Sequence, residues 1–600
     1  MDHTPADRAS DASGAYDYIV IGSGPGGGPV AANLAEAGFS VLVLEAGPPS
    51  GDATFRDVPL FFPKATDDPE VAWEFWVQHY DGGKATHGDS WIDDKGGVLY
   101  PRSATIGGCA VHNASIVMYP AHGDWDEIME LTGDEGWHHE AMWRHWQKVL
   151  AWQALSSNDP FADLESGRAH PDRLVDSLDG PAWYLESKQG VKNSGKLNDR
   201  ENVGTAGFWN LENGIKDGVR QGVRDRLLSA ASSCPRLEIR CDALVEKILF
   251  EPGDSGPRAV GVRFLNGRHL YDASPKHRRT TEAERADMRR TVRARREIIV
   301  AGGAYNSPQI LMLSGIGPAE HLRSHGIEVL VDSPRVGGNL QDRREISVVD
   351  EYHLPELADN RHVTDLAESL ASKDSPGPSA CLDAWRADPA SSPLGMYGNP
   401  CVNYTTEGSD RPTTNVCTTG APFQFRNHHP DWVDEARATI GRTWTWLSLM
   451  GYTEDRDGYV RLRSADPTRS PEINFRAFGN GTGGDADLDA LVAAIEVCRS
   501  INRAEGGGGA EIFPGSEVED LRDFIRKEHY GHHPACSNPI GRTRADSAVD
   551  STFKVHGTEG LRVVDASVFP KMPGLFLIAA VETLSQKASV DILRDARARG

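Results

Sequence analysis

The sequence predicts an α/β fold with two domains, one built on a parallel sheet and one of α+β type built on an antiparallel sheet. The stretch from Tyr18 to Gly47 has the pattern of a strand, a glycine turn, a helix and a second strand, which starts a parallel βαβ unit. A second buried strand, Glu297 to Ala301, ends in another glycine pair. Between residues 346 and 527 alternating, strand-like patterns replace the glycine-rich segments. Together these observations indicate a Rossmann-like domain joined to an α+β domain.

The first glycine turn has the spacing of a dinucleotide-binding loop. Gly22, Gly24 and Gly27 give the pattern Gly-x-Gly-x-x-Gly between an apolar strand and an alanine-rich helix. The missing side chains allow a tight turn, let a pyrophosphate approach the backbone, and let helix and strand pack closely. The N-terminus of the helix offers free N–H groups and a partial positive charge to the anion. We therefore expect a dinucleotide at this turn.

The second strand ends in a carboxylate, Glu45. A carboxylate at this distance from the glycine turn accepts hydrogen bonds from the ribose hydroxyls of an adenosine, and it repels a phosphorylated ribose. These residues alone leave open whether the dinucleotide is NAD or FAD.

Composition and charge exclude several classes of protein. The chain has 600 residues, too many for one simple core, and its 62 glycines and 39% hydrophobic residues are typical of a loop-rich α/β protein. A net charge of −24 argues against binding to nucleic acid or to anionic membranes. No apolar run is long enough to span a bilayer, and residues 1–15 are unlike a signal peptide. The 8 cysteines are scattered, so we expect neither a zinc site nor a disulfide framework, and we expect a cytoplasmic location.

The order of these segments divides the chain into domains. We assign residues 16–345 to the dinucleotide-binding domain, with loop-rich insertions near 50–98 and 153–210. Residues 346–527 form the antiparallel domain, and residues 528–600 return to the first domain.

Local patterns predict individual elements within these domains. The helix after the second glycine pair is expected to begin with Ser307 as N-cap and Pro308 at its first position. The basic run from Lys276 to Arg296 is expected to be a solvated connection, because acidic residues interrupt it. Further helices are expected at 29–37, 218–231 and 485–503, and further strands at 237–250, 259–264, 458–464 and 471–475, the last two in the antiparallel sheet.

A further glycine pair lies between Tyr100 and Met118. Gly107 and Gly108 are flanked by small residues, which indicates close approach of the backbone to something flat or phosphorylated.

At this point the chain resembles the glucose-methanol-choline (GMC) oxidoreductases, a family of FAD-dependent enzymes that oxidise alcohols. The resemblance covers nearly the whole chain. The family pattern Pro-Arg-Gly-x-x-x-Gly-Gly-Ser-Ser-x-x-Asn is echoed by Pro101, Arg102, Gly107, Gly108 and Asn113. Further matching segments are Gly303 to Pro318, Val336 to Asp342, His533-Pro534 and Asp565 to Pro570, with Arg343 in place of a usual His.

The resemblance implies that the dinucleotide is FAD. Members similar to choline oxidase carry Gly-Gly-Cys-x-x-His-Asn at the position of His112, and that histidine is bonded covalently to the flavin. A histidyl-FAD at His112 is therefore expected, the alternative being a histidine that only contacts the flavin or packs in a turn. The resemblance also implies that the backbone of Val245 touches the adenine. It places Asp565 and Ala566 in the segment that wraps the flavin ring.

The family's catalytic histidine matches His533. Oxidation of an alcohol requires loss of the hydroxyl proton and transfer of a hydride to flavin N5, so a base beside the flavin is needed, and histidine suits that requirement. We expect His533 to act as the base and to hydrogen-bond the substrate oxygen, and we expect its neighbour His532 to point elsewhere.

One position departs from the family pattern. A second His or Asn is expected opposite the base, and the matching residue here is Phe576, which can neither donate nor accept a hydrogen bond. Either His533 works alone, or a polar group such as His532 or Asn538 fills in, or the alignment shifts locally. An apolar wall at Phe576 would favour a bulky or partly apolar alcohol over a small polyol.

The sequence therefore predicts an alcohol oxidase or dehydrogenase with a small-molecule alcohol as substrate and oxygen or another electron acceptor as its partner. Alternatives are a flavoprotein of the same fold that performs other tailoring chemistry on a bulky metabolite, and a non-catalytic FAD-binding protein. The presence of His533 argues against the last of these. The oligomeric state leaves no signal in the sequence.

Overall fold

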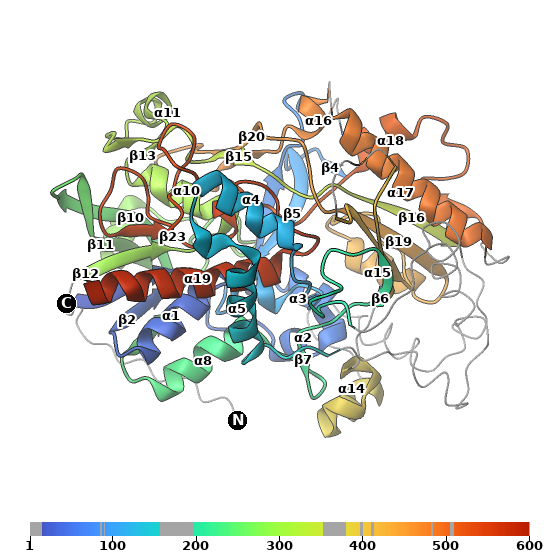
Figure 1. Cartoon of the computed structure of the whole chain (residues 1–600), viewed down its shortest axis with the longest axis horizontal. Coiled ribbons are helices and arrows are strands. Elements are labelled where there is room, and N and C mark those ends of the chain that lie inside the picture. The colour runs from blue at the N-terminus through green and yellow to red at the C-terminus, as the bar shows by residue number, and fades with distance from the viewer. Residues whose placement is uncertain are drawn as a thin grey trace.

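Two sheets dominate the computed structural model and lie in opposite halves of the molecule (Figure 1). The structure describes residues 15–83, 87–88, 90–156, 196–351, 380–395, 400–407, 409, 413–481, 484–504 and 509–598. None of the helices in these ranges combines the length and the hydropathy that a membrane crossing requires.

The first sheet has 7 strands and contains the predicted βαβ unit. Its strands are β1 (Ala15–Ile21), β2 (Val41–Leu44), β9 (Leu237–Arg240), β10 (Ala243–Pro252), β11 (Pro257–Asn266), β12 (Arg289–Val300) and β23 (Leu561–Val563). β1 pairs in parallel with β2 and β12, and β2 pairs in parallel with β9. The first half of β12 pairs antiparallel with β11, and its second half pairs in parallel with β23. A strand from the C-terminal segment therefore pairs with the N-terminal sheet.

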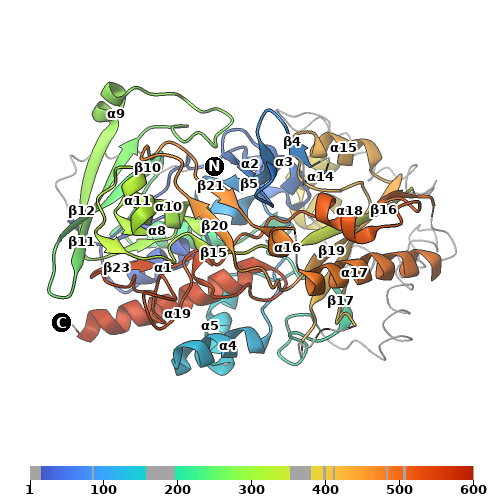
Figure 2. The same cartoon turned by 90° about the horizontal axis from the view of Figure 1, so that it is seen from above.

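Helices pack against this sheet (Figure 2). α1 (Gly27–Glu36) presents Val30, Ala31, Leu34 and other small or branched apolar residues to the core, so it lies close to the strands. The C-terminal helix α19 (Leu577–Ala598) packs on α1 and on α5 (His139–Leu150). The other helices in this half are α4 (His122–Thr132), α8 (Val223–Ser233), α9 (Glu282–Met288), α10 (Gly303–Leu313) and α11 (Ala319–Ser324).

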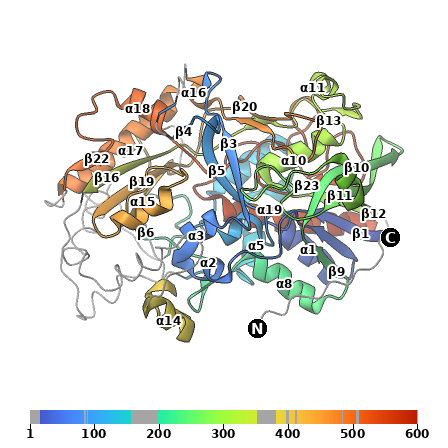
Figure 3. The same ribbon diagram turned by 180° about the vertical axis from the view of Figure 1, so that it is seen from behind.

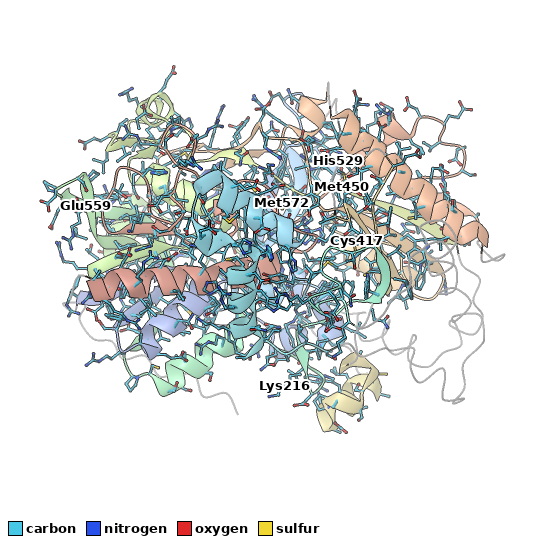
Figure 4. The ribbon with its side chains drawn as sticks, viewed as in Figure 1. Lys216, Cys417, Met450, His529, Glu559 and Met572 are labelled. Atoms are coloured by element: carbon cyan, nitrogen blue, oxygen red, sulfur yellow. The ribbon has the colours of Figure 1, made fainter. Side chains whose placement is uncertain are left out.

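The second sheet has 6 strands, and all its pairings are antiparallel. Its strands are β22 (Glu511–Phe513), β16 (Glu345–Glu351), β19 (Thr443–Met450), β18 (Val416–Ala421), β17 (Pro400–Tyr404) and β6 (Gly207–Asn210), in that spatial order. α17 (Asp485–Ala504), predicted at 485–503, packs on β16, β18 and β19, with α18 (Leu521–Glu528) beside it (Figure 3). Cys417 and Met450, labelled in Figure 4, lie on β18 and β19. Smaller helices in this half are α14 (Ala380–Ala387), α15 (Trp432–Thr439) and α16 (Ala477–Asn480).

Several expectations about local structure were wrong. β20 (Gly458–Arg461) and β21 (Glu472–Asn474) pair antiparallel as expected, but they form a separate sheet with β15 (Gly338–Leu340) instead of joining the 6-stranded sheet. The basic run expected to be a connection forms α9 and most of β12. Its arginines are paired with acids, for example Arg289 with Glu246.

The two insertions also differ from the expectation of loops. The first contains α2 (Ala53–Asp57), α3 (Phe62–Asp67), β3 (Ala72–Val77) and β4 (Trp91–Ile92), and β3 and β4 flank β5 (Gly97–Ser103). Residues 157–195 of the second lie outside the described part of the chain, but its end supplies β6 to the second sheet. Short two-stranded pairs are β7 (Ile215–Lys216) with β8 (Val219–Arg220), and β13 (Ile316–Gly317) with β14 (Val331–Asp332).

The helix after β12 begins earlier than predicted. α10 starts at Gly303 after the cap Gly302, so Ser307 is not the N-cap and Pro308 lies inside the helix. A proline there has no N–H for the carbonyl one turn earlier, Ala304, and Ser537 Oγ donates to that carbonyl instead at 2.5 Å. Ser307 is used differently, because its hydroxyl donates to Asp565 and accepts from the N–H of Gly302.

Candidate active site

A cavity of about 380 Å³ extends from the glycine turn after β1 to the histidines at 532 and 533. Its walls come from both halves of the molecule. Gly22, Gly24, Glu45 and Asp565 lie at one end, which we call the glycine end. The other end, which we call the histidine end, is lined by imidazole and aromatic rings and by residues of β18 and β19.

The three motif glycines have different roles in the structure. Gly22 has φ +98° and turns the chain out of β1. A Cβ at Gly27 would meet the carbonyl oxygen of Gly22 at 2.1 Å, so this glycine lets α1 pack against the turn, and it does not line the cavity. At Gly24 the nearest atom to such a Cβ is Gly108 Cα at 3.8 Å. Gly24 is therefore bare toward the cavity, where a flat or phosphorylated group can approach its backbone.

Glu45 is buried at the end of β2 and faces the same turn. Its Oε2 accepts hydrogen bonds from the N–H of Ser23 at 3.1 Å and from Ser23 Oγ at 2.6 Å, and its Oε1 accepts from Gly47 N at 3.1 Å. Burial raises the pKa of Glu45, and these hydrogen bonds oppose the rise. The carboxylate keeps acceptor capacity toward the cavity.

The second glycine pair lies against the first loop. Gly107 and Gly108 both have positive φ, +99° and +55°, and Gly107 N donates to Ser23 Oγ at 3.2 Å. Gly108 lines the cavity, whereas Gly107 does not, because a Cβ there would point at Val111. The loop thus places Gly108 opposite Gly24.

His112 lies in the cavity wall beyond this loop. Its Nδ1 is buried with no hydrogen-bond partner among the described residues. Burial, together with the positive charges of Arg102 and Arg220, lowers the pKa of His112 to about 3, so the imidazole is neutral. Asn113, next in the chain, accepts from Arg220 Nη1 at 2.8 Å and faces the cavity.

Other predicted residues also face the cavity. Val245 lines the glycine end, and so do Asp565 and Ala566. Asp565 accepts hydrogen bonds from Gly303 N at 2.9 Å and Ser567 N at 2.8 Å, which tie the C-terminal segment to α10. Arg102 donates to the backbone carbonyls of Pro101 and His532, so it joins the second glycine loop to the histidine end.

His533 is held at the histidine end by two carboxylates. The backbone N–H of His533 donates to Asp342 Oδ1 at 2.8 Å. The imidazole Nδ1 lies 3.2 Å from Glu345 Oε1, in hydrogen-bonding geometry. Burial lowers the pKa of His533 well below its ordinary value, and His532, Arg343 and Arg102 add to this effect. Since the carboxylate of Glu345 accepts from Nδ1–H, the lone pair of the ring lies on Nε2.

His532 was expected to point elsewhere, and this expectation was wrong. The residue lines the cavity, its ring centroid is 4.1 Å from that of His533, and its Nδ1 lies 3.2 Å from the same oxygen of Glu345. Asn538 shows the opposite. It is fully buried outside the described cavity lining, where its backbone N–H donates to Ser567 O and its Nδ2 donates to Ser567 Oγ. Asn538 therefore anchors the segment after His533, and its position does not fit the expected catalytic role.

Phe576 lines the cavity with its ring 5.8 Å from that of His533. The segment before it is fixed by Arg343, the residue that replaces a usual His. The guanidinium of Arg343 is completely buried and donates to the carbonyls of Gly451, Pro573 and Gly574. The change at 343 thus supports the loop that positions Phe576.

The histidine end has an aromatic wall that the sequence analysis did not find. Phe425, His428 and Trp432 form edge-to-face contacts, and the ring of His428 is 5.4 Å from that of His532. Phe62 and Phe423 also line the cavity. The tripeptide His-His-Pro occurs both at 428–430 and at 532–534, and this repetition is a signal that could have pointed to His428.

Comparison with known proteins gives one family over most of the chain. A model described as GMC oxidoreductase matches residues 16–345, and a second with the same description matches residues 454–584. Choline oxidase of Arthrobacter globiformis is 27% identical, covering 97% of this chain and 95% of the relative. Oxygen-dependent choline dehydrogenase of Staphylococcus xylosus is 28% identical, covering 96% and 95%. Patulin synthase of Aspergillus clavatus is 25% identical, covering 96% and 91%.

Solved structures show the same fold. Formate oxidase superposes with a TM-score of 0.75 at 20% identity, covering 98% of this chain and 100% of that one. A fungal aryl-alcohol oxidase superposes with a TM-score of 0.69 at 20% identity, covering 97% and 99%.

Proposed function

Since the chain belongs to the GMC oxidoreductase family, whose members bind FAD and oxidise alcohols, we propose that it oxidises a bulky, aromatic alcohol to a carbonyl compound with His533 as the base. The observation that carries this proposal is one continuous cavity with a dinucleotide-binding turn at one end and His533 at the other. The dinucleotide cofactor of this family is FAD. When FAD is bound, it accepts the hydride from the alcohol carbon.

The residues present fit FAD. Gly24 and Gly108 lie close together, since a Cβ at Gly108 would be 3.0 Å from Gly24 Cα, and both line the cavity next to the start of α1. Pyrophosphate would lie there, on the helix N-terminus. Glu45 would accept hydrogen bonds from the ribose, Val245 would border the adenine, and Asp565 with Ala566 would border the flavin.

Two features of its surroundings, burial and the contact with Glu345, prepare His533 to act as a base. Burial keeps the ring neutral, and Glu345 holds it by Nδ1–H so that Nε2 is the free acceptor. The substrate hydroxyl gives its proton to Nε2. The resulting imidazolium is balanced by the adjacent carboxylate of Glu345, as in other carboxylate–histidine pairs.

We also propose a covalent bond between His112 and the flavin. The imidazole is neutral, lies in the cavity wall and has an unpartnered ring nitrogen. A neutral imidazole has the lone pair that bond formation requires. After acid denaturation, yellow colour should stay with the precipitated wild-type protein and pass into the supernatant for His112→Ala. Colour in the supernatant of both proteins would contradict the covalent bond.

The histidine end favours an aromatic alcohol without positive charge. Phe62, Phe425, Trp432 and Phe576 provide ring faces and edges, and aromatic rings pack on one another with directional preference. Glu45 and Asp565, the carboxylates among the described lining residues, lie at the glycine end. No carboxylate of the described lining can therefore balance a cationic substrate at the histidine end.

Anaerobic mixing with a panel of alcohols tests the function. The panel pairs benzyl alcohol with cyclohexylmethanol, which has similar size without aromaticity, and adds choline as a cationic alcohol. Bleaching of the flavin absorbance by benzyl alcohol, with slower bleaching by the other two, is the expected result. Flavin that stays oxidised with every alcohol would contradict alcohol oxidation and favour other chemistry on this fold.

A further inference from the structure

The described lining of the cavity has no polar group at the position opposite His533. Phe576 occupies that position and offers no donor or acceptor to a substrate oxygen. Asn538 is tied to Ser567 outside the described lining. A polar side chain of the described lining that does lie beside the base is the imidazole next to it in sequence, His532, whose ring centroid is 4.1 Å from that of His533.

One carboxylate oxygen serves both imidazoles. Glu345 Oε1 lies 3.2 Å from His533 Nδ1 and 3.2 Å from His532 Nδ1, although the second contact lies off the line of a hydrogen bond. Glu345 is completely buried behind the two rings and is not itself part of the described cavity lining. Because both rings turn Nδ1 toward Glu345, the opposite edge of each, which carries Nε2, is the edge that can face the substrate.

The two imidazoles differ in how accessible they are. The side chain of His533 is 14% exposed and that of His532 is 27% exposed, so His532 has the more accessible ring. Burial and the like charge of His532, Arg343 and Arg102 hold the pKa of His533 well below its ordinary value. The other titratable groups facing the pair are Asp342, His428 and His112.

We propose that His532 is the second catalytic residue of this enzyme and donates a hydrogen bond from Nε2–H to the substrate oxygen, in place of the polar residue missing at Phe576. This inference rests on the proposed alcohol oxidation. His533 and His532 then act as an acceptor and donor pair on one carboxylate.

The proton and electron balance is complete within the proposed reaction. The O–H bond of the alcohol breaks and its proton goes to His533 Nε2. The C–H bond breaks with its electron pair, which leaves as hydride to the bound FAD, and the C–O bond becomes a double bond. His532 keeps its proton throughout and stabilises the negative charge that develops on oxygen.

A substitution and its rescue test the proposal. His532→Phe should lower the rate of anaerobic flavin reduction by about 10²-fold, the usual effect of losing one donor to a developing charge. Adding Phe576→Asn to His532→Phe should restore about tenfold of that loss, because an amide N–H then reaches the same oxygen from the opposite wall. His429→Phe is the matched control, since His429 is the neighbour of another wall histidine, does not belong to the described lining and contacts Glu435 instead. Its rate should equal that of the wild type.

Binding of an alkoxide mimic gives a readout that a merely structural role would not move. Benzoate, an anionic mimic of the alkoxide, should bind the oxidised wild type more tightly than it binds His532→Phe, and adding Phe576→Asn to that variant should restore part of the affinity. The rise of the rate with pH as His533 becomes neutral should be the same in the wild type and in His532→Phe.

The outcomes separate the two proposals. If the wild type reduces its flavin with an alcohol and His532→Phe does so equally fast, or if that variant binds benzoate as tightly as the wild type, the role of His532 is overturned and the alcohol oxidation stands. A slow His532→Phe that Phe576→Asn does not rescue also overturns it. If no alcohol bleaches the flavin of the wild type, the proposed function itself fails.

Discussion

The two ends of the cavity are built from different materials. At the glycine end, Gly22, Gly24 and Gly108 present peptide groups, and one carboxylate, Glu45, marks the end of β2. At the histidine end, the wall consists of aromatic and imidazole rings. These rings come from the segment that follows β18 and from residues 532 and 533, and side-chain contacts such as that of His428 with His532 position them.

This difference decides which end of the cavity can be predicted from the amino-acid sequence. Recognition by backbone requires fixed spacing between glycines, because the chain must turn and approach the ligand at set points. Recognition by side chains requires only that a residue reach a point in space, and residues on β18, after β18 and after α18 can all do so. The first requirement leaves a local pattern, whereas the second does not.

Removal of the base should have the largest effect. His533→Ala takes away the proton acceptor, so the rate of anaerobic flavin reduction should fall by about 10³-fold or more, within the range for loss of a general base. Flavin content, read from the ratio of absorbance at the flavin and protein maxima, should stay at the wild-type level because the glycine end is untouched. If His533→Ala also lost its flavin, the division between the two ends would be incorrect.

Two glycines of the same loop, the motif residue Gly24 and its neighbour Gly26, should separate cofactor binding from folding. Gly26→Ala places a Cβ 2.0 Å from the carbonyl oxygen of Val564, an overpacking that costs about 1–3 kcal/mol of unfolding free energy. Gly24→Ala meets nothing closer than 3.8 Å, so the fold should tolerate it while the methyl group obstructs the pyrophosphate. Urea unfolding of the purified variants and their flavin content after purification measure the two effects.

The matched pair has a clear contrary result. Equal stability of Gly24→Ala and Gly26→Ala, with equal flavin content, would show that the turn does not carry the cofactor as proposed.

The outcome for the sequence predictions follows the same division. Gly22, Gly24, Glu45 and the pairing of β1 with β2 were predicted, because strand, turn and helix are neighbours in the chain. The place of His428 was missed and that of His532 was predicted wrongly, since adjacent residues in an irregular segment carry no period that tells which one faces inward.

Longer-range structure was also beyond the sequence. The addition of β6 to the second sheet joins Gly207–Asn210 to Pro400–Tyr404, and no local pattern specifies a partner that far along the chain. The use of Arg343 to fix the loop before Phe576 depends on three carbonyls that only the fold brings together.

Phe576 offers a smaller, more specific test of the histidine end. Phe576→Ala removes an apolar wall beside the base, so kcat/KM for benzyl alcohol should fall about tenfold relative to kcat/KM for ethanol, in line with the value of apolar contacts in a pocket. The rate with ethanol should change little because His533 keeps its contact with Glu345. Equal losses with both alcohols would show that Phe576 supports the base and does not select the substrate.

The last prediction concerns the stability of the junction between the halves, which depends on neutral imidazoles. His79, after β3, lies against His529, after α18, with ring centroids 4.4 Å apart and an angle of 30° between the ring planes, and both are completely buried. Figure 4 labels His529 on the side of the molecule that carries α17 and α18. Burial lowers the pKa of each well below its ordinary value, and Arg344, paired with Asp455, adds to the effect.

The sign of the pH effect follows from these depressed values. Below the unfolded pKa, about 6.5, the unfolded chain binds a proton that the folded protein does not, so stability is present at neutral pH and is lost as pH falls. Each histidine should cost about 1.4 kcal/mol of unfolding free energy between pH 7.5 and 5.5. Urea unfolding at the two pH values should show that loss reduced by this amount in His529→Gln. His325→Gln, at the partly exposed end of α11, serves as the control. An unchanged pH dependence in His529→Gln would mean that the folded protein tolerates a charged imidazole at position 529. Acid would then destabilise the junction less than the buried, neutral pair of His79 and His529 indicates.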